Sequence, residues 1–131
     1  MDDLRHFFGR DQFAKLAGIE LLSFSPGRAV AQMRIHPHHL NAIGIVQGGA
    51  IFTLADLAFA AASNAHRKAA VAINVSITYV KATSSGTLRA EARELSLSPK
   101  LATYTVDVTD ESKALVAVFQ GLVYRKSQPI P

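Results

Sequence analysis

Residues 41–64, NAIGIVQGGAIFTLADLAFAAASN, decide how this chain folds. The stretch begins as a loop, passes through the glycine pair Gly48 and Gly49, and continues without any break in hydrophobicity. Residues 50–65 carry Ala, Leu, Phe and Ile on every side of a helix, and a helix that is apolar all round is enclosed by protein. Most of these side chains are small, so a sheet can approach closely. We therefore predict one long central helix wrapped by a sheet.

Asp56 is the only formally charged residue between Arg34 and Arg67, histidines aside. An unpaired carboxylate in an apolar environment costs several kcal/mol or takes up a proton and becomes neutral. Asp56 therefore pairs with a Lys or Arg from elsewhere, faces solvent on a half-exposed helix, or is kept for function. The sequence leaves these alternatives open.

Alternation of apolar and polar residues predicts strands on both sides of the helix. Residues 19–24 and 28–36 form a hairpin through the turn Ser25-Pro26-Gly27. Four more runs follow the helix, and the odd-numbered apolar residues from Val71 to Tyr79 are expected on one face. The phase shifts between Ala92 and Leu95, as a β-bulge requires. This order predicts an α+β domain with a largely antiparallel sheet of about six strands wrapped around the helix.

Length and composition limit the class of protein. A chain of 131 residues can build one hydrophobic core, and no linker or repeat divides it. We expect a single domain over residues 1–131, with an N-terminal helical segment over residues 1–17 and a loose tail over residues 126–131. The apolar composition, 49% hydrophobic against 18% charged, suggests a soluble protein whose surface is partly covered by other subunits. Without cysteine, signal peptide or membrane-length apolar run, we expect a cytoplasmic location.

The net charge of +4 raises the question of nucleic-acid binding. Lys and Arg are scattered singly rather than gathered on one face, so we expect no nucleic-acid partner. A modest positive field equally suits a small polyanionic ligand, such as a phosphate-bearing cofactor tail. His36, His38 and His39 are close in sequence, but Pro37 separates the first from the pair. Metal ligands must converge on one point, so we expect a solvated loop here and no metal site.

The segments Asn41-Ala42-Ile43-Gly44, Gly48-Gly49 and Leu54-Ala55-Asp56 resemble a family signature, N-x-x-G-x-x-H-G-G followed by L-A-D. It belongs to the hot-dog fold acyl-CoA thioesterases of the phenylacetate-degradation (PaaI-like) type. The resemblance implies a hot-dog fold and hydrolysis of an aryl or medium-chain acyl-CoA to the free acid and CoA. It implies no separate cofactor, because coenzyme A is part of the substrate. It also implies a homo-oligomer, with a dimer as minimum and a tetramer, a dimer of dimers, as the full assembly.

The resemblance assigns catalytic roles to Asn41, Gly48 and Asp56. The Gly48 N–H, at the positive end of the central helix, would hydrogen-bond the thioester carbonyl. Asp56 would act as general base on a water or as nucleophile, and Asn41 would orient the water or the substrate. Eight residues of helix separate Gly48 from Asp56 by about 12 Å, so one carbonyl cannot touch both. We therefore expect each site to combine Gly48 of one subunit with Asp56 of its neighbour.

The same resemblance places Gln47 and Gly49 beside the substrate, and Lys81 and Lys100 at the rim near the CoA phosphates. Two positions depart from the family. Gln47 stands where many members have His, and it cannot titrate near pH 7. Ala72 stands where some members have a Ser that helps hold the water.

Two other functions are compatible with these residues. A hot-dog domain can bind acyl-CoA without cleaving it, which would make the chain a catalytically silent binding protein. A hot-dog dehydratase would use a His with a carboxylate for proton transfer, and Gln47 removes the most suggestive His. We expect a thioesterase in preference to either.

Overall fold

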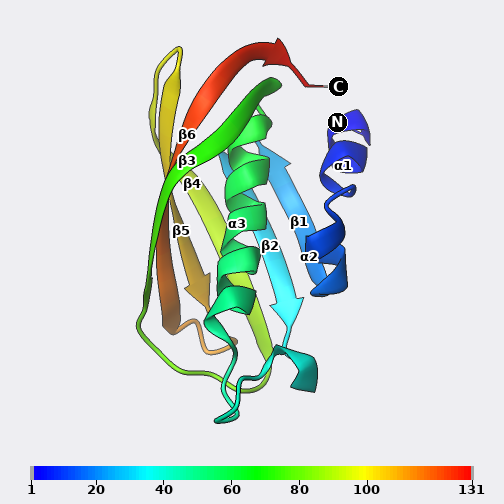
Figure 1. The fold of residues 1–131 in the computed structure, drawn as a ribbon, viewed down its shortest axis with the longest axis vertical. Coiled ribbons are helices and arrows are strands. Elements are labelled where there is room, and N and C mark those ends of the chain that lie inside the picture. Colours follow the sequence, from blue (N-terminus) through cyan, green and yellow to red (C-terminus); the bar gives the residue numbers. More distant parts are fainter. Residues whose placement is uncertain (1, 131) are drawn as a thin grey trace.

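The chain forms one antiparallel sheet that curves around a long helix (Figure 1). This computed structural model describes residues 2–130. The helices are α1 (Asp2–Phe8), α2 (Gln12–Leu16) and α3 (Gly48–Asn64), with a 3-10 turn, η1 (Pro37–His39). The strands are β1 (Ile19–Ser25), β2 (Arg28–Arg34), β3 (Lys68–Tyr79), β4 (Thr87–Leu97), β5 (Leu101–Thr109) and β6 (Leu115–Pro129).

The strands are arranged in the order β1-β2-β4-β5-β6-β3. Each pairs antiparallel with its neighbours, so β1 and β3 are the two edges. Helix α3 packs on one face of this sheet, while α1 and α2 lie beside it near β1 (Figure 1). The predicted α+β architecture, with about six antiparallel strands around one long helix, is confirmed.

The centre of α3 can approach the sheet closely because of a glycine on β6. A β-carbon at Gly121 would lie 2.5 Å from the ring of Phe59, closer than two carbon atoms can pack. The Phe59 ring instead fills that space and packs against Tyr104 and Phe119. Bulky aromatic residues thus fill the middle of the core, and small residues such as Ala58 and Ala62 are buried along the same helix.

Two details of the strands differ from expectation. The predicted common face from Val71 to Tyr79 is wrong at its start, because the register shifts between Ala72 and Asn74. Val71 pairs with Tyr124 while Val75 pairs with Gly121, so the two valines point to opposite faces. The bulge predicted in the next strand is confirmed, since the β4–β5 register shifts between Glu94 and Ser96.

The tail predicted to be loose over residues 126–131 is instead ordered as far as Ile130. Strand β6 continues to Pro129, which pairs with Lys68, and the Ile130 N–H donates to the Arg67 carbonyl at 3.2 Å. Residue 131 lies outside the described residues. The N-terminal segment forms α1 and α2, with residue 1 likewise undescribed. No helix within residues 2–130 is long and apolar enough to cross a membrane.

Candidate active site

The Gly48 amide is a free hydrogen-bond donor at the start of α3. Gln47 precedes it in an extended conformation and caps the helix, its Oε1 accepting from the Gly49 N–H at 2.5 Å. The Gly48 N–H itself makes no hydrogen bond within residues 2–130. A helix N-terminus carries partial positive charge, which attracts negative oxygen atoms. This amide can therefore stabilise an oxyanion.

Tyr79, on β3, helps to position Gly48, the residue that carries this N–H. Its hydroxyl donates to the Gly48 carbonyl at 2.9 Å, and a β-carbon at Gly48 would lie 3.0 Å from its ring. The peptide group between Gly48 and Gly49 is thus held at both ends, its carbonyl by Tyr79 and its N–H by Gln47. Gln47, which we expected beside the substrate, helps to position the residue that carries the donor.

Asp56 lies half-buried near the middle of α3, on the same stripe as Thr53 and Ala60. It has no hydrogen bond or ion pair with any residue in the described range 2–130. Burial raises the pKa of its carboxyl, and the nearby negative charge of Asp11 raises it further. The alternative that Asp56 pairs with a Lys or Arg of its own chain is therefore wrong. An accessible carboxylate with a raised pKa is suited to accept a proton.

Asn41 organises the loop that leads to Gly48. Its Oδ1 accepts from the Ile43 N–H at 3.1 Å and from the Ile45 N–H at 3.3 Å. Gly44 reverses the chain with a φ of 86°, in the left-handed region that favours glycine. Because the Asn41 oxygen is used within the loop, the amide nitrogen is the group that remains for water or substrate.

The structure brings Asn41, Gly48 and Lys81 together around one cavity of about 380 Å³, with Tyr79 on its wall. Lys81 also forms an ion pair with Asp110 at 2.5 Å, and this contact is the main reason that the pKa of Asp110 is well below its usual range. Lys100 lies in the turn between β4 and β5, at the opposite end of the sheet from the start of α3 (Figure 1). One subunit alone therefore does not bring the two lysines together.

The environment of one histidine, His39, differs from expectation. His39 is buried rather than solvated: its Nδ1 accepts from the His36 N–H at 2.9 Å, and its Nε2 lies 2.7 Å from the Ala17 carbonyl. The second contact requires a proton on Nε2, so His39 ties η1 to the end of α2. Within residues 2–130, no group of three potential ligand residues could hold a metal ion.

A partly buried polar network near the end of α3 was not predicted from the sequence. His66 Nε2 lies 2.7 Å from Glu94, and the Tyr104 hydroxyl donates to the same carboxylate oxygen at 2.6 Å. Burial and the Glu94 carboxylate raise the pKa of Tyr104 far above its ordinary value. The three residues come from separate elements, so no local pattern signals the contact. The network lies at the far end of α3 from Gly48.

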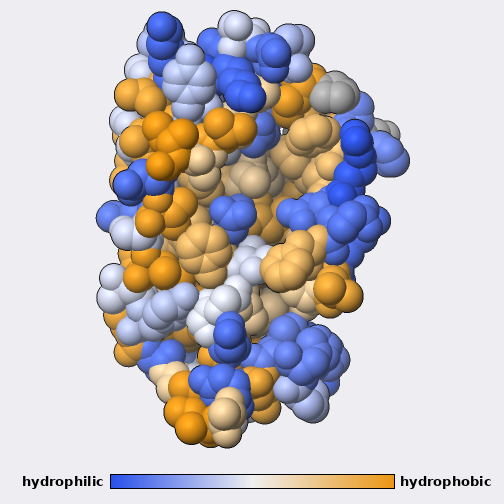
Figure 2. All heavy atoms as spheres, viewed as in Figure 1, coloured by the Kyte–Doolittle hydropathy of each residue, from blue (hydrophilic) through white to orange (hydrophobic). Residues whose placement is uncertain are grey.

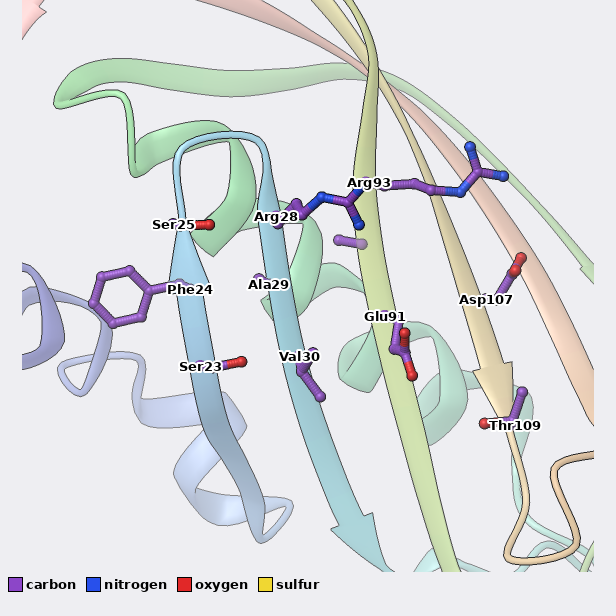
Figure 3. Close-up of a pocket in the computed structure, with 11 residues that line it drawn as sticks. Ser23, Phe24, Ser25, Arg28, Ala29, Val30, Glu91, Arg93, Asp107 and Thr109 are labelled. Atoms are coloured by element: carbon purple, nitrogen blue, oxygen red, sulfur yellow. The ribbon is translucent and has the colours of Figure 1, made fainter.

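A further cavity, of about 370 Å³, lies on the outer face of the sheet and is lined by charged residues (Figure 3). Arg28 and Arg93 are directly opposite each other on β2 and β4, and Glu91 is opposite Asp107. Their strand neighbours, such as Ala92, are buried toward α3, so the charged side chains face away from the helix. This cavity contains neither Gly48 nor Asp56.

The fold and the candidate site together define a class of protein. The sheet has six antiparallel strands around a helix, and this helix begins with a free glycine amide and carries an unpaired carboxylate. These features are typical of a hot-dog thioester hydrolase. The particular family follows from the match of residues 43–117 to the thioesterase superfamily, and the chain belongs to this family.

Individual relatives agree with this assignment. The chain is 33% identical over 119 residues to the acyl-coenzyme A thioesterase PaaI of Escherichia coli strain K12, covering 90% of this chain and 85% of the relative. The structure of the E. coli PaaI protein matches with a TM-score of 0.94 at 30% identity, over 99% and 95% of the two chains. A Streptococcus mutans UA159 protein bound to acetyl CoA matches with a TM-score of 0.81 at 26% identity, over 86% and 91%. The predicted hot-dog, PaaI-like acyl-CoA thioesterase family is confirmed.

Proposed function

We propose that this protein hydrolyses aryl or medium-chain acyl-CoA in the cytoplasm, releasing the free acid and CoA. The observation that carries the proposal is the combination of a free Gly48 N–H and an unpaired Asp56 on one helix. The Streptococcus mutans relative, which binds acetyl CoA, supports a CoA thioester as substrate. The proposed reaction needs no cofactor, because coenzyme A belongs to the substrate. An assay of thiol release across a panel of acyl-CoA thioesters tests it, and absence of release with retained binding would indicate a silent binding protein.

In the proposed mechanism the Gly48 N–H donates to the thioester oxygen as negative charge develops on it. Asp56 takes a proton from a water that attacks the carbonyl carbon, or its carboxylate attacks that carbon directly and water later releases the acid. The C–S bond breaks in either case, and CoA leaves as the thiol after taking up a proton. The Asn41 amide nitrogen would orient the water, since its oxygen is already bonded within the loop.

The proposed site requires two subunits, and the edge strand β3 supports a dimer. Apolar side chains on β3 are about half exposed, Val71 at 43% and Ile73 at 55%. Figure 2 shows apolar side chains running along this edge of the molecule, at the left. Pairing of two β3 strands across a two-fold axis would cover this edge and set two α3 helices antiparallel. Gly48 of one subunit would then approach Asp56 of the other.

A tetramer of two such dimers would use the outer face of the sheet. The arginine pair Arg28 and Arg93 lies beside the acidic pair Glu91 and Asp107 on this face (Figure 3). A row of positive charge next to a row of negative charge is self-complementary under a two-fold rotation. The exposed Lys100 at the far end of one subunit and Lys81 near the start of α3 of the other would contact the CoA phosphates.

Mixing two inactive variants tests the shared site. Gly48→Pro lacks the donor N–H and Asp56→Asn lacks the carboxylate, so each is expected to be inactive alone. After dissociation and reassociation, half of the dimers are mixed and each has one intact site, which restores about a quarter of the wild-type activity. Activity is measured by thiol release, and mixed dimers are counted by native mass spectrometry. If mixed dimers form without recovery, the two residues do not act across the interface.

Removal of the Tyr79 hydroxyl tests the positioning of the Gly48 amide. Tyr79→Phe keeps the ring but loses the hydrogen bond to the Gly48 carbonyl, worth about 1 kcal/mol. We expect kcat to fall about fivefold with little change in KM, because the donor acts mainly on the transition state. Tyr124→Phe, at an exposed tyrosine on β6, serves as control. Equal kcat values for the two variants would show that Tyr79 does not position the donor.

A further inference from the structure

A cavity of about 600 Å³ lies between α2, η1 and the first turns of α3. This volume is within the range of pockets that bind small organic ligands. Its lining includes Phe13, Leu16 and Ala17 from the N-terminal segment, and Gly49, Phe52 and Thr53 from α3. Figure 1 shows α2 beside α3 in this region, with η1 below.

The walls of this cavity are chemically apolar. Phe13 is 65% exposed and Leu16 is 78% exposed, although both are large hydrophobic residues. Two polar groups on the opposite walls are occupied within the protein: the Thr53 hydroxyl donates to the Gly49 carbonyl at 2.7 Å, and both His39 ring nitrogens have partners. His38 and Gln47 supply the other polar groups of the lining, and the rest is apolar. A ligand that fills the cavity would therefore be held mainly by apolar contact.

The wall that α2 provides is fixed in place at both ends. The Asp11 side chain caps the start of α2 by accepting from the Ala14 N–H at 3.0 Å. The buried His39 ring holds the Ala17 carbonyl at the end of the helix. Phe13 and Leu16 are thus presented on a defined surface, which can select ligands by size.

The cavity adjoins the proposed reaction centre. Thr53 precedes Asp56 by three residues on the same stripe of α3, a rise of about 4.5 Å. Helix α2 contacts α3, and the negative charge of Asp11 at the start of α2 acts on the Asp56 carboxyl. A thioester carbonyl held at Asp56 would place a substituent of a few atoms within reach of the cavity.

We propose that this cavity receives the acyl group of the substrate, and that Phe13 and Leu16 are specificity-determining residues for uncharged, apolar acyl groups. The inference rests on the proposed hydrolysis of acyl-CoA and names where the acyl group binds. Both residues lie outside residues 43–117, the part that matches the thioesterase superfamily model. The signature that this chain shares with the family therefore does not specify this wall.

The test compares acyl length in the wild type and in Phe13→Ser/Leu16→Ser. Each methylene buried contributes about 0.8 kcal/mol, or about fourfold. In the wild type, kcat/KM should rise at least about tenfold from acetyl-CoA to hexanoyl-CoA, and the double variant should lose most of that rise while keeping its activity on acetyl-CoA. Leu95→Ser/Leu97→Ser, which changes two exposed leucines at the far end of β4, is the matched control and should keep the rise.

A binding measurement separates this inference from the proposed function. S-hexyl-CoA and S-methyl-CoA are thioethers that cannot be hydrolysed, and calorimetry gives their affinities for the same three proteins. If the wild type prefers the hexyl compound and only Phe13→Ser/Leu16→Ser loses that preference, the cavity binds the acyl group. This result supports the inference even when no thioester is cleaved, and missing cleavage then rejects only the proposed hydrolysis. A preference that survives Phe13→Ser/Leu16→Ser overturns the inference while leaving hydrolysis intact. A drop in oligomer mass with an unchanged preference would also overturn it, because α2 would then contact a partner subunit.

Discussion

Asp56→Asn is expected to abolish thioester hydrolysis while the fold remains intact. The substitution is nearly isosteric and removes the charge that accepts a proton or attacks the carbonyl. General base catalysis contributes about 10²- to 10⁴-fold, so kcat/KM should fall by at least that much. The same carboxylate must be ionised to act, and because burial raises its pKa, wild-type activity should decline on acidification at a pH above that of an ordinary aspartate. A pH profile of kcat/KM from thiol release measures both effects.

The stability of this variant distinguishes a catalytic carboxylate from a structural one. A raised pKa in the folded state means that Asp56 favours the fold below its unfolded pKa, and that this contribution is lost as pH rises through the folded value. At pH 7 the charged Asp56 therefore destabilises the folded state, and the neutral Asn does not. The melting temperature of Asp56→Asn should be equal to that of the wild type or higher. A melting temperature lower by several degrees, with turnover within tenfold of wild type, would assign Asp56 to an ion pair with a partner subunit.

Gly48→Pro is expected to remove the oxyanion donor without breaking α3. Proline is well tolerated at the first position of a helix, and Gln47 already has the extended conformation, φ −65° and ψ 135°, that a residue before proline requires. The missing N–H should lower kcat by about 10²- to 10³-fold. Steady-state kinetics with hexanoyl-CoA, together with circular dichroism to monitor α3, measures the loss.

Gly48→Ala is the matched control for this substitution. Both variants introduce a β-carbon about 3.0 Å from the Tyr79 ring, and both therefore displace that ring slightly, but alanine keeps the N–H. The ratio of their kcat values separates replacement of the N–H by the proline ring from the crowding at Tyr79 that both variants share. Similar kcat values would show that the amide plays no part and that only crowding against Tyr79 matters.

The sequence predicts α3 well because its evidence is local. An apolar run, a glycine pair at its start and one charge in its middle all lie within residues 41–64. The same stretch identifies Gly48 and Asp56 as chemically unusual. The bulge in β4 can be predicted for the same reason, because the alternation of apolar residues changes phase between Ala92 and Leu95, which are close in sequence.

Contacts between distant residues were not predictable. Tyr79 holds a carbonyl 31 residues away, and His66 meets a carboxylate 28 residues away. The residues of β6 after Lys126 are held in place by pairing with β3. Their polar composition alone had predicted a loose tail. For Asn41 the residue type was informative but the role was not, because one amide oxygen can fold a loop or hold a water equally well.

The position of β3 in the sheet also has a consequence for synthesis on the ribosome. Within one subunit, the strand next to β3 in the sheet is β6, which is the last strand to be translated. Strand β3 therefore emerges from the ribosome long before its partner. At about 5–20 residues per second, the roughly 35 residues between them take a few seconds to translate. During that interval a long, apolar strand is exposed with both edges unpaired, and it can associate with other nascent chains. Slower elongation lengthens this interval, so the yield of native protein should fall when translation is slowed and should improve when chaperones that bind extended apolar segments are abundant.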